Sequence, residues 1–164
     1  MLHNPEPAPP TRLIHVDLDE SSIGSNSPEV EHERQVAIYD LIEENTFELV
    51  AGPPGPYKLG IAIAEHRLVF AVTAQEADEP DAMFLLSLNP FRKVVKDYFL
   101  ICESYFEAIK HAPPAKIEAI DMARRALHDE GSALVMERLE GKIRLDEPTS
   151  RRLFTLLCAL HWKG

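Results

Sequence analysis

The longest amphipathic pattern in the chain lies between Asn89 and His111. Asn89 followed by Pro90 is typical of a helix start, with an N-cap residue before a proline at the first helical position. Beyond it, apolar side chains recur at alternating steps of four and three residues, which place them on one helical face: Phe91, Val95, Tyr98, Cys102, Tyr105 and Ile109. The pattern predicts one long helix over residues 89–111, packed deep in the core.

Helical spacing also appears in four other segments. Ser27-Pro28-Glu29 combines an N-cap residue, a proline and an acid in the first turn, and it predicts a helix that runs to about Asn45. In the second half of the chain, the spacing predicts helices over residues 115–129, 133–140 and 149–162. Gly131 is interpreted there as a helix stop, and Ser132 as the cap of the next helix.

Alternating apolar and polar positions predict strands before the long helix. They fall at residues 12–19, 46–51, 57–74 as a hairpin, and 82–88. Strands followed by helices, without strict alternation, favour the α+β class. We therefore expect a small antiparallel sheet from the N-terminal half, packed against a helical C-terminal half. Residues 1–11 are rich in proline and are predicted to form a disordered tail, before a single α+β domain over residues 12–164.

The composition agrees with a soluble globular protein. Of 164 residues, 45% are hydrophobic and 27% are charged. No apolar stretch approaches the length of a membrane span, and the N-terminus does not resemble a secretory signal. The two cysteines, Cys102 and Cys158, fall on apolar helical faces, where buried reduced thiols are the simplest interpretation. These features predict a cytoplasmic location and no contact with a membrane.

The formal charge of −10 is unevenly distributed. Residues 1–88 hold 16 acidic and four basic residues, whereas residues 89–164 hold 11 acidic and 13 basic residues. Nucleic acid is not expected as a partner, because phosphate contacts need clustered lysine and arginine. The two halves could simply dock on each other through opposite charge. Alternatively, the second half would attract a small anionic ligand.

Four cations follow the starts of two predicted helices. Arg92 and Lys93 follow Asn89-Pro90, and Arg151 and Arg152 follow Pro148-Thr149. Helix N-termini normally attract acids, so cations in a first turn suggest an anion site, where free backbone N–H groups would assist. The alternative is structural: Lys93 pairs with Asp97, and Arg151 and Arg152 meet the acidic half. The sequence alone leaves open whether the two helix starts converge.

His128 is a weaker candidate for chemistry. It lies four residues after Arg124, so the two share a helical face, and Asp129 and Glu130 follow it. A histidine beside carboxylates could move a proton or bind a metal. Equally, a histidine near a helix C-terminus favours the helix dipole. We add Arg124 to the candidate anion-binding residues, keep His128 as a catalytic candidate, and predict neither a metal site nor a cofactor.

Aromatic residues surround much of the long helix. Phe91, Tyr98, Phe99, Tyr105 and Phe106 would mostly fill the core. Some of them could remain exposed, and the helix would then form a homodimer or partner-protein interface.

Several short motifs resemble those of uncharacterised protein family 0262, a set of small bacterial proteins. They are Leu88-Asn89-Pro90-Phe91-Arg92, Lys96-Asp97-Tyr98-Phe99, Cys102-Glu103-Ser104-Tyr105, Ile117-Glu118-Ala119-Ile120-Asp121, His128-Asp129-Glu130-Gly131-Ser132 and Arg151-Arg152-Leu153-Phe154. The resemblance extends over about residues 12–164. It implies no activity and no functional residues.

The sequence therefore favours a non-catalytic regulatory or accessory protein that binds a partner protein or a small anionic ligand. The alternative is a small enzyme for a phosphorylated or carboxylated metabolite. In that case, Arg92, Lys93, Arg151 and Arg152 would hold the anion and His128 would transfer the proton.

Overall fold

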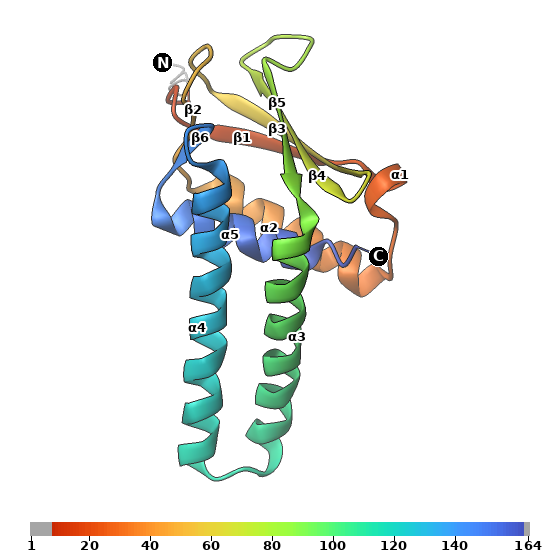
Figure 1. The fold of residues 1–164 in the computed structure, drawn as a ribbon, viewed down its shortest axis with the longest axis vertical. Coiled ribbons are helices and arrows are strands. Elements are labelled where there is room, and N and C mark those ends of the chain that lie inside the picture. The colour runs from red at the N-terminus through yellow and green to blue at the C-terminus, as the bar shows by residue number, and fades with distance from the viewer. Residues whose placement is uncertain (1–7, 163–164) are drawn as a thin grey trace, which may run out of the picture.

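A computed structural model describes residues 8–162, and it shows a sheet, a layer of two helices and a long helical hairpin (Figure 1). The strands are β1 (Leu13–Leu18), β2 (Phe47–Leu49), β3 (Tyr57–Ala64), β4 (Arg67–Ala74), β5 (Ala82–Ser87) and β6 (Ile143–Leu145). The helices are α1 (Glu20–Ile23), α2 (Pro28–Glu43), α3 (Leu88–His111), α4 (Pro114–Leu139) and α5 (Glu147–Ala159). The predicted α+β class is confirmed.

The main sheet has the strand order β1-β3-β4-β5 and is mixed. Strands β3, β4 and β5 are antiparallel, as the hairpin pattern predicts. The prediction of a wholly antiparallel sheet is wrong for β1, which pairs with β3 in parallel. Helix α2 carries the chain back before β3 begins, and such a crossover connection is what parallel neighbours need. Strands β2 and β6 form a separate antiparallel pair.

Helices α2 and α5 lie beneath one face of the sheet (Figure 1). The hydrophobic core includes Leu41 of α2, Leu59 and Phe70 of the sheet, and Phe154 and Leu157 of α5, all almost fully buried. Burial of this apolar area is the main stabilising contribution to such a fold.

Both helices that carry the candidate cations begin earlier than the sequence predicts. The N-cap of α3 is Ser87 rather than Asn89, and the N-cap of α5 is Asp146, whose side chain accepts a hydrogen bond from the Thr149 N–H at 3.0 Å. Arg92 and Arg151 are consequently the fifth residues of their helices. The first turn of α3 carries no charge, and that of α5 carries Glu147, so neither first turn breaks the dipole preference.

Gly131 does not end a helix, and the predicted break there is wrong. Helix α4 runs through it without interruption. A Cβ at position 131 would lie 2.2 Å from Cζ of Phe154, so the missing side chain lets α5 cross α4 closely. Glycine lowers helix propensity by only about 1 kcal/mol, which tertiary packing here outweighs.

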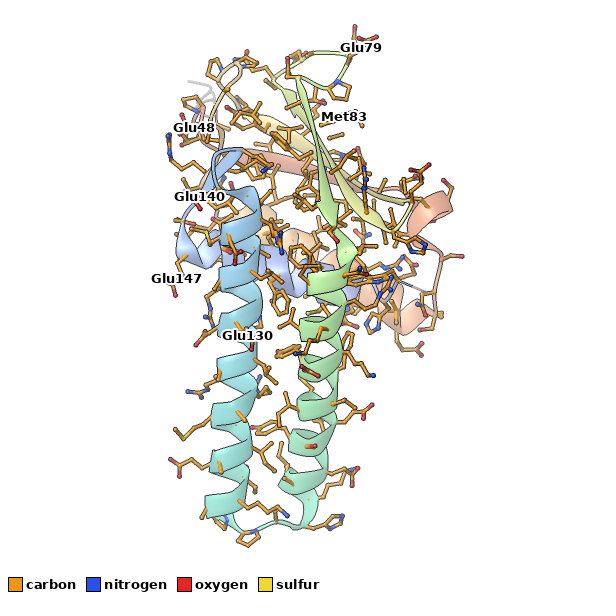
Figure 2. The ribbon with its side chains drawn as sticks, in the orientation of Figure 1. Glu48, Glu79, Met83, Glu130, Glu140 and Glu147 are labelled. Carbon is orange, nitrogen blue, oxygen red and sulfur yellow. The ribbon has the colours of Figure 1, made fainter. Side chains whose placement is uncertain are left out.

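Helices α3 and α4 pair along their length and project beyond the layer formed by α2 and α5 (Figure 1). At the far end of this hairpin, side chains point away from both helices, and no other element of residues 8–162 lies beside them (Figure 2). Exposed apolar residues on these helices include Leu100, Phe106, Ile109 and Met122. Within residues 8–162, no helix is both long and apolar enough to cross a bilayer.

Much of the predicted disordered tail, residues 1–11, lies outside the described residues. At its end, the Pro10 carbonyl accepts a hydrogen bond from Gly55 N–H, and the Thr11 carbonyl accepts one from Phe47 N–H, both at 2.8 Å.

Candidate functional site

A small apolar pocket lies between the first half of α3 and the two residues His161 and Trp162 that follow α5. We call it the Phe99 pocket. It has a volume of about 260 Å³, and its lining is mostly apolar. The residues that line it are Arg92, Val95, Lys96, Phe99, Leu100, His161 and Trp162. Two cations beside aromatic and aliphatic walls suit a ligand with an anionic group on an apolar body.

The residues after α5 are fixed in place by two interactions of His161. The His161 ring stacks on Phe99, with 4.9 Å between the ring centroids and 21° between the planes. The His161 Nε2 lies 3.1 Å from Glu33 Oε2. His161 has a φ of 47°, in the left-handed region, so the chain turns sharply here and brings Trp162 back toward α3.

Arg34 of α2 holds the end of α5. Its side chain is 1% exposed, and Nε donates to the Ala159 carbonyl at 3.3 Å, while Nη2 donates to the carbonyls of Leu160 and Gly24. Glu31 balances its charge at 2.9 Å. The last carbonyls of a helix lack intrahelical partners, so Arg34 both satisfies them and fixes the point from which His161 enters the pocket.

The cations of the Phe99 pocket are not neutralised by neighbours. Among residues 8–162, neither Arg92 nor Lys96 forms an ion pair with a carboxylate. The Arg92 Nε is buried and has no hydrogen-bond acceptor in that part of the chain. A buried donor without a partner is costly, and an anion in the pocket would provide the acceptor once the Arg92 side chain moves to expose Nε.

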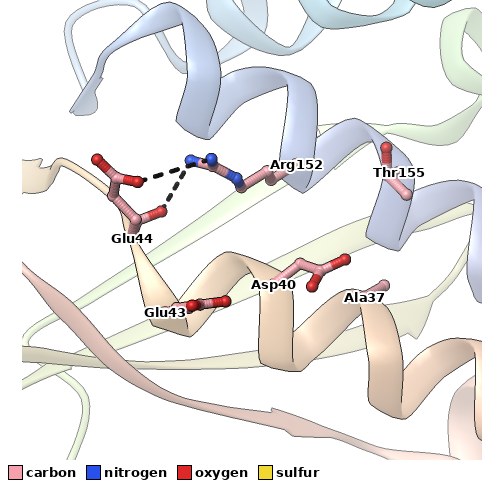
Figure 3. A pocket seen from close by; sticks show the side chains of 6 residues that line it. All are labelled: Ala37, Asp40, Glu43, Glu44, Arg152 and Thr155. Carbon is pink, nitrogen blue, oxygen red and sulfur yellow. Dashed lines mark hydrogen bonds and ion pairs between the residues drawn. The ribbon is translucent and has the colours of Figure 1, made fainter.

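Arg152 lies in a different place, a groove between α2 and α5 that Figure 3 shows. Its Nη1 donates to the Glu44 carbonyl at 3.0 Å, and its Nη2 lies 4.0 Å from Glu44 Oε2. Asp40 and Glu43 also line the groove. Three carboxylates around one engaged arginine repel an anion, so the structural alternative, a contact with the acidic half, describes Arg152 better.

Lys93 and Arg151 contribute to neither of these two pockets. Lys93 lines a hollow together with Asp97, Glu130 and Glu137, and Arg151 pairs with Asp129. The four sequence-predicted cations therefore do not share one pocket, and only Arg92 belongs to the Phe99 pocket.

The His128 side chain of α4 makes T-shaped ring contacts with Tyr98 of α3 and Phe154 of α5. Its Nε2 is 2.9 Å from Thr155 Oγ1, and that hydroxyl donates to the Arg151 carbonyl. Because the hydroxyl has one hydrogen, Nε2 carries the imidazole proton. The Nδ1 atom is buried and has no partner among the described residues. Burial and the positive charge of Arg151 lower the pKa of His128, so it is neutral.

Arg124 is engaged within its own helix. It donates to Asp121 Oδ1 at 2.6 Å and 3.1 Å, and its guanidinium lies 4.9 Å above the centroid of Tyr105. Nearby, burial raises the pKa of Tyr98 to about 12, so its hydroxyl stays protonated. Arg124 is thus paired with Asp121, and His128 with Thr155, and neither bonds to the other. In the part of the chain that is described, no group of three metal-ligating side chains gathers.

Sequence reasoning missed most of the Phe99 pocket. Lys96 lies one turn after Arg92, a spacing visible in the sequence, but it is not among the candidate anion-binding residues. The sequence pattern places Phe99 in the core, and nothing in the spacing of His161 and Trp162 places them against α3. Their position depends on Arg34, which looks like one more charge on a solvated helix.

A comparison with family models matches residues 10–163 to the uncharacterised protein family UPF0262. The chain belongs to this family. Curated relatives are UPF0262 proteins of Azorhizobium caulinodans (57% identical over 95% of this chain and 97% of the relative), Brucella anthropi (58%, with the same coverage) and Xanthobacter autotrophicus (56% over the full length of both). UPF0262 is a family of uncharacterised proteins, and the match confirms the resemblance that the sequence motifs show. No solved structure matches the chain.

Proposed function

We propose that this UPF0262 protein is a non-catalytic regulatory or accessory protein that binds a small ligand in the Phe99 pocket. The ligand joins an anionic group, a carboxylate or a phosphate, to an apolar body. The observation that carries the proposal is the buried, unpartnered Arg92 Nε beside an apolar pocket. The cytoplasmic location expected from the two reduced cysteines belongs to the same proposal.

The size and lining of the pocket narrow the ligand class. A volume of about 260 Å³ is at the low end for small-molecule sites and suits an acyl chain or one aromatic ring. Phe99, Leu100 and Trp162 would contact the apolar body, and Arg92 and Lys96 would pair with the anionic group. Inorganic phosphate alone would leave the apolar walls unused and bind weakly.

Catalysis has less support. The alternative enzyme needs His128 beside an anion-holding cation. Its Nε2 is occupied by Thr155, its Nδ1 is buried, and the neighbouring Arg124 and Arg151 are paired with Asp121 and Asp129. A general base must reach the proton that it removes, and His128 offers no nitrogen to the Phe99 pocket.

A thermal-shift panel tests the proposal. It contains fatty acids and aromatic carboxylates, alkyl phosphates, inorganic phosphate, and the alcohols that match each acid. A ligand at 100 times its dissociation constant stabilises a protein by about 2.7 kcal/mol, a rise in melting temperature of roughly 5–10 °C for a chain of this size. We expect acids with apolar bodies to give such a rise and their alcohols to give far less.

The matched variants are Arg92→Gln and Lys93→Gln. Arg92 lines the Phe99 pocket, whereas its neighbour Lys93 lines the hollow beside Glu130. The Arg92→Gln protein should lose the stabilisation, and the Lys93→Gln protein should keep it. If no member of the panel raises the melting temperature, or if both variants respond alike, the proposed site is wrong.

A further inference from the structure

Strand β5 forms an open edge of the main sheet. It is last in the order β1-β3-β4-β5, and its register with β4 continues without a shift from Arg67 opposite Ser87 to Val72 opposite Ala82. Its sequence, Ala-Met-Phe-Leu-Leu-Ser, contains no charge, no proline and no glycine. Natural edge strands usually carry such residues or a bulge to prevent pairing with another chain, and β5 has none of these protections.

The free hydrogen-bonding groups of β5 belong to its odd-numbered residues. The Leu88 N–H donates to the His66 carbonyl at 3.2 Å, in line with the β4–β5 register. Backbone groups alternate between the two sides of a strand, so Leu86 and Phe84 also bond toward β4. Met83 and Leu85 therefore direct their N–H and C=O groups away from β4. Within residues 8–162, no other segment donates to or accepts from these groups.

The same two residues carry exposed apolar side chains. Met83 is 62% exposed and Leu85 is 54% exposed. Because Phe84 and Leu86 pack on the core and side chains alternate along a strand, Met83 and Leu85 lie on the face of the sheet opposite α2 and α5, the helices that Figure 1 shows on the other face. Their cross-strand neighbours on β4 are Ala71 and Val69. The edge and the adjoining face therefore form one apolar surface with unsatisfied backbone groups, which is the surface that an added strand would cover.

We propose that the occupant is β5 of a second copy of this chain, paired antiparallel about a two-fold axis that passes near Phe84. The two four-stranded sheets then form one continuous sheet of eight strands. The axis is perpendicular to the sheet, so the helices of both copies stay on one face.

The self-pairing is complementary at each position. With the axis at Phe84, Met83 of one copy lies opposite Leu85 of the other, and each pair exchanges the backbone hydrogen bonds that β4 leaves free. Both cross-strand contacts are apolar, and no like charges meet. Helix α3 begins at Leu88, after the paired stretch, so it does not interrupt the ladder. Two-fold dimers with self-complementary interfaces are also the commonest closed assemblies.

The competing surface is the projecting hairpin, which the sequence suggested as an interface. Phe106 and Ile109 are exposed there, but Glu107 and Lys110 lie between and beside them. Two such helices could pair only if their charged residues matched, whereas β5 is uncharged and can pair with β5 of a second copy without matching charges. We therefore favour β5.

Sedimentation of the full-length protein over a range of concentrations, combined with amide hydrogen exchange measured by NMR, tests the proposal. We expect a monomer–dimer equilibrium. The amides of Met83 and Leu85 should be protected from exchange only at concentrations at which the dimer forms. The amides of Phe84 and Leu86 bond to β4 and should be protected at every concentration.

Two matched variants locate the interface. Leu85→Lys adds a charge to the edge at an exposed position and should raise the dissociation constant of the dimer at least about tenfold, with an unchanged circular dichroism spectrum. Phe106→Lys alters an equally exposed residue on the hairpin and should leave the dimer intact. The proposal is overturned if the protein is a monomer at all concentrations. It is equally overturned if Phe106→Lys alone dissociates the dimer, or if exchange at Met83 and Leu85 does not depend on concentration.

Discussion

Gly131 of α4 lies directly against the ring of Phe154 of α5, so closely that a Cβ at position 131 would come within 2.2–2.5 Å of three ring atoms. Phe154 is completely buried. This contact lets α5 cross the base of the hairpin, and it fixes how the hairpin joins the body of the protein.

Gly131→Ala should therefore destabilise the protein, although alanine is the better helix former. Overpacking of a core costs about 1–3 kcal/mol, against a gain of up to ~1 kcal/mol in helix propensity, and we expect a net loss of about 1–2 kcal/mol. Urea unfolding measures this net loss in the free energy of unfolding. Adding Phe154→Leu should remove the clash, so the double variant should lose less than the sum of the two single losses. Additive losses would show that the two residues are not in contact.

Arg34→Met should cost about 3 kcal/mol, because it leaves the buried carbonyls of Ala159 and Leu160 without a donor. Arg125→Met removes an arginine from the exposed surface and provides the control, with an expected loss below about 1 kcal/mol. Chemical unfolding compares the two variants. If their losses are equal, Arg34 does not hold the end of α5.

His128 should make stability depend on pH. Burial and Arg151 lower its pKa in the folded state, so the unfolded chain, with a histidine pKa of about 6.5, binds the proton more readily. The stabilising contribution of neutral His128 is complete above this unfolded pKa and is lost as the pH falls below it toward the folded pKa.

The His128→Gln variant tests this linkage, because glutamine can still donate to Thr155. The free energy of unfolding should fall less between pH 8 and pH 5.5 in the variant than in the wild type. The difference between the two curves isolates His128 from the other histidines. Parallel curves would mean that His128 titrates alike in both states.

Asp146→Ala should cost about 1 kcal/mol, because Asp146 caps α5 through the Thr149 N–H. Glu147→Ala is the matched control: Glu147 lies in the same first turn but acts only on the helix dipole, so its removal should cost about 0.5 kcal/mol or less. Thermal unfolding compares the stability of the two variants. A larger loss of stability in Glu147→Ala than in Asp146→Ala would contradict the assigned N-cap.

The spacing of apolar residues predicts the elements whose formation depends on neighbours in the sequence. The alternation in residues 57–74 predicted the β3–β4 hairpin, and the three–four spacing from Phe91 to Ile109 predicted α3. The parallel pairing of β1 could not be predicted in this way, since it depends on where α2 returns the chain. The interpretation of Gly131 as a helix stop is wrong, because glycine is needed there for the close approach of Phe154, 23 residues away in the sequence.

The candidate site was predictable only in part. The sequence singles out Arg92 because its charge lies near a predicted helix start. Arg92 does line the Phe99 pocket, but α3 starts at Leu88, so Arg92 lies beyond the first turn and the helix N-terminus is not part of the pocket. Residue type groups Arg152 and Arg124 with Arg92, yet each is engaged by a nearby carboxylate. Whether a cation is free depends on tertiary neighbours, and these are not visible in sequence spacing.

The central claim is that the Phe99 pocket binds an anion with an apolar body, and the protein contains its own reporter. Trp162 is the only tryptophan in the chain and lines this pocket. A ligand that enters the pocket should therefore change the tryptophan fluorescence directly.

The decisive measurement is a fluorescence titration with sodium octanoate, beside octan-1-ol and inorganic phosphate. We predict a saturable change with octanoate, a dissociation constant at least about tenfold higher for Arg92→Gln, and no difference for Lys93→Gln. Octanol and phosphate should each bind far more weakly. The account is contradicted if octanoate causes no saturable change, or if its affinity is the same in both variants and the wild type.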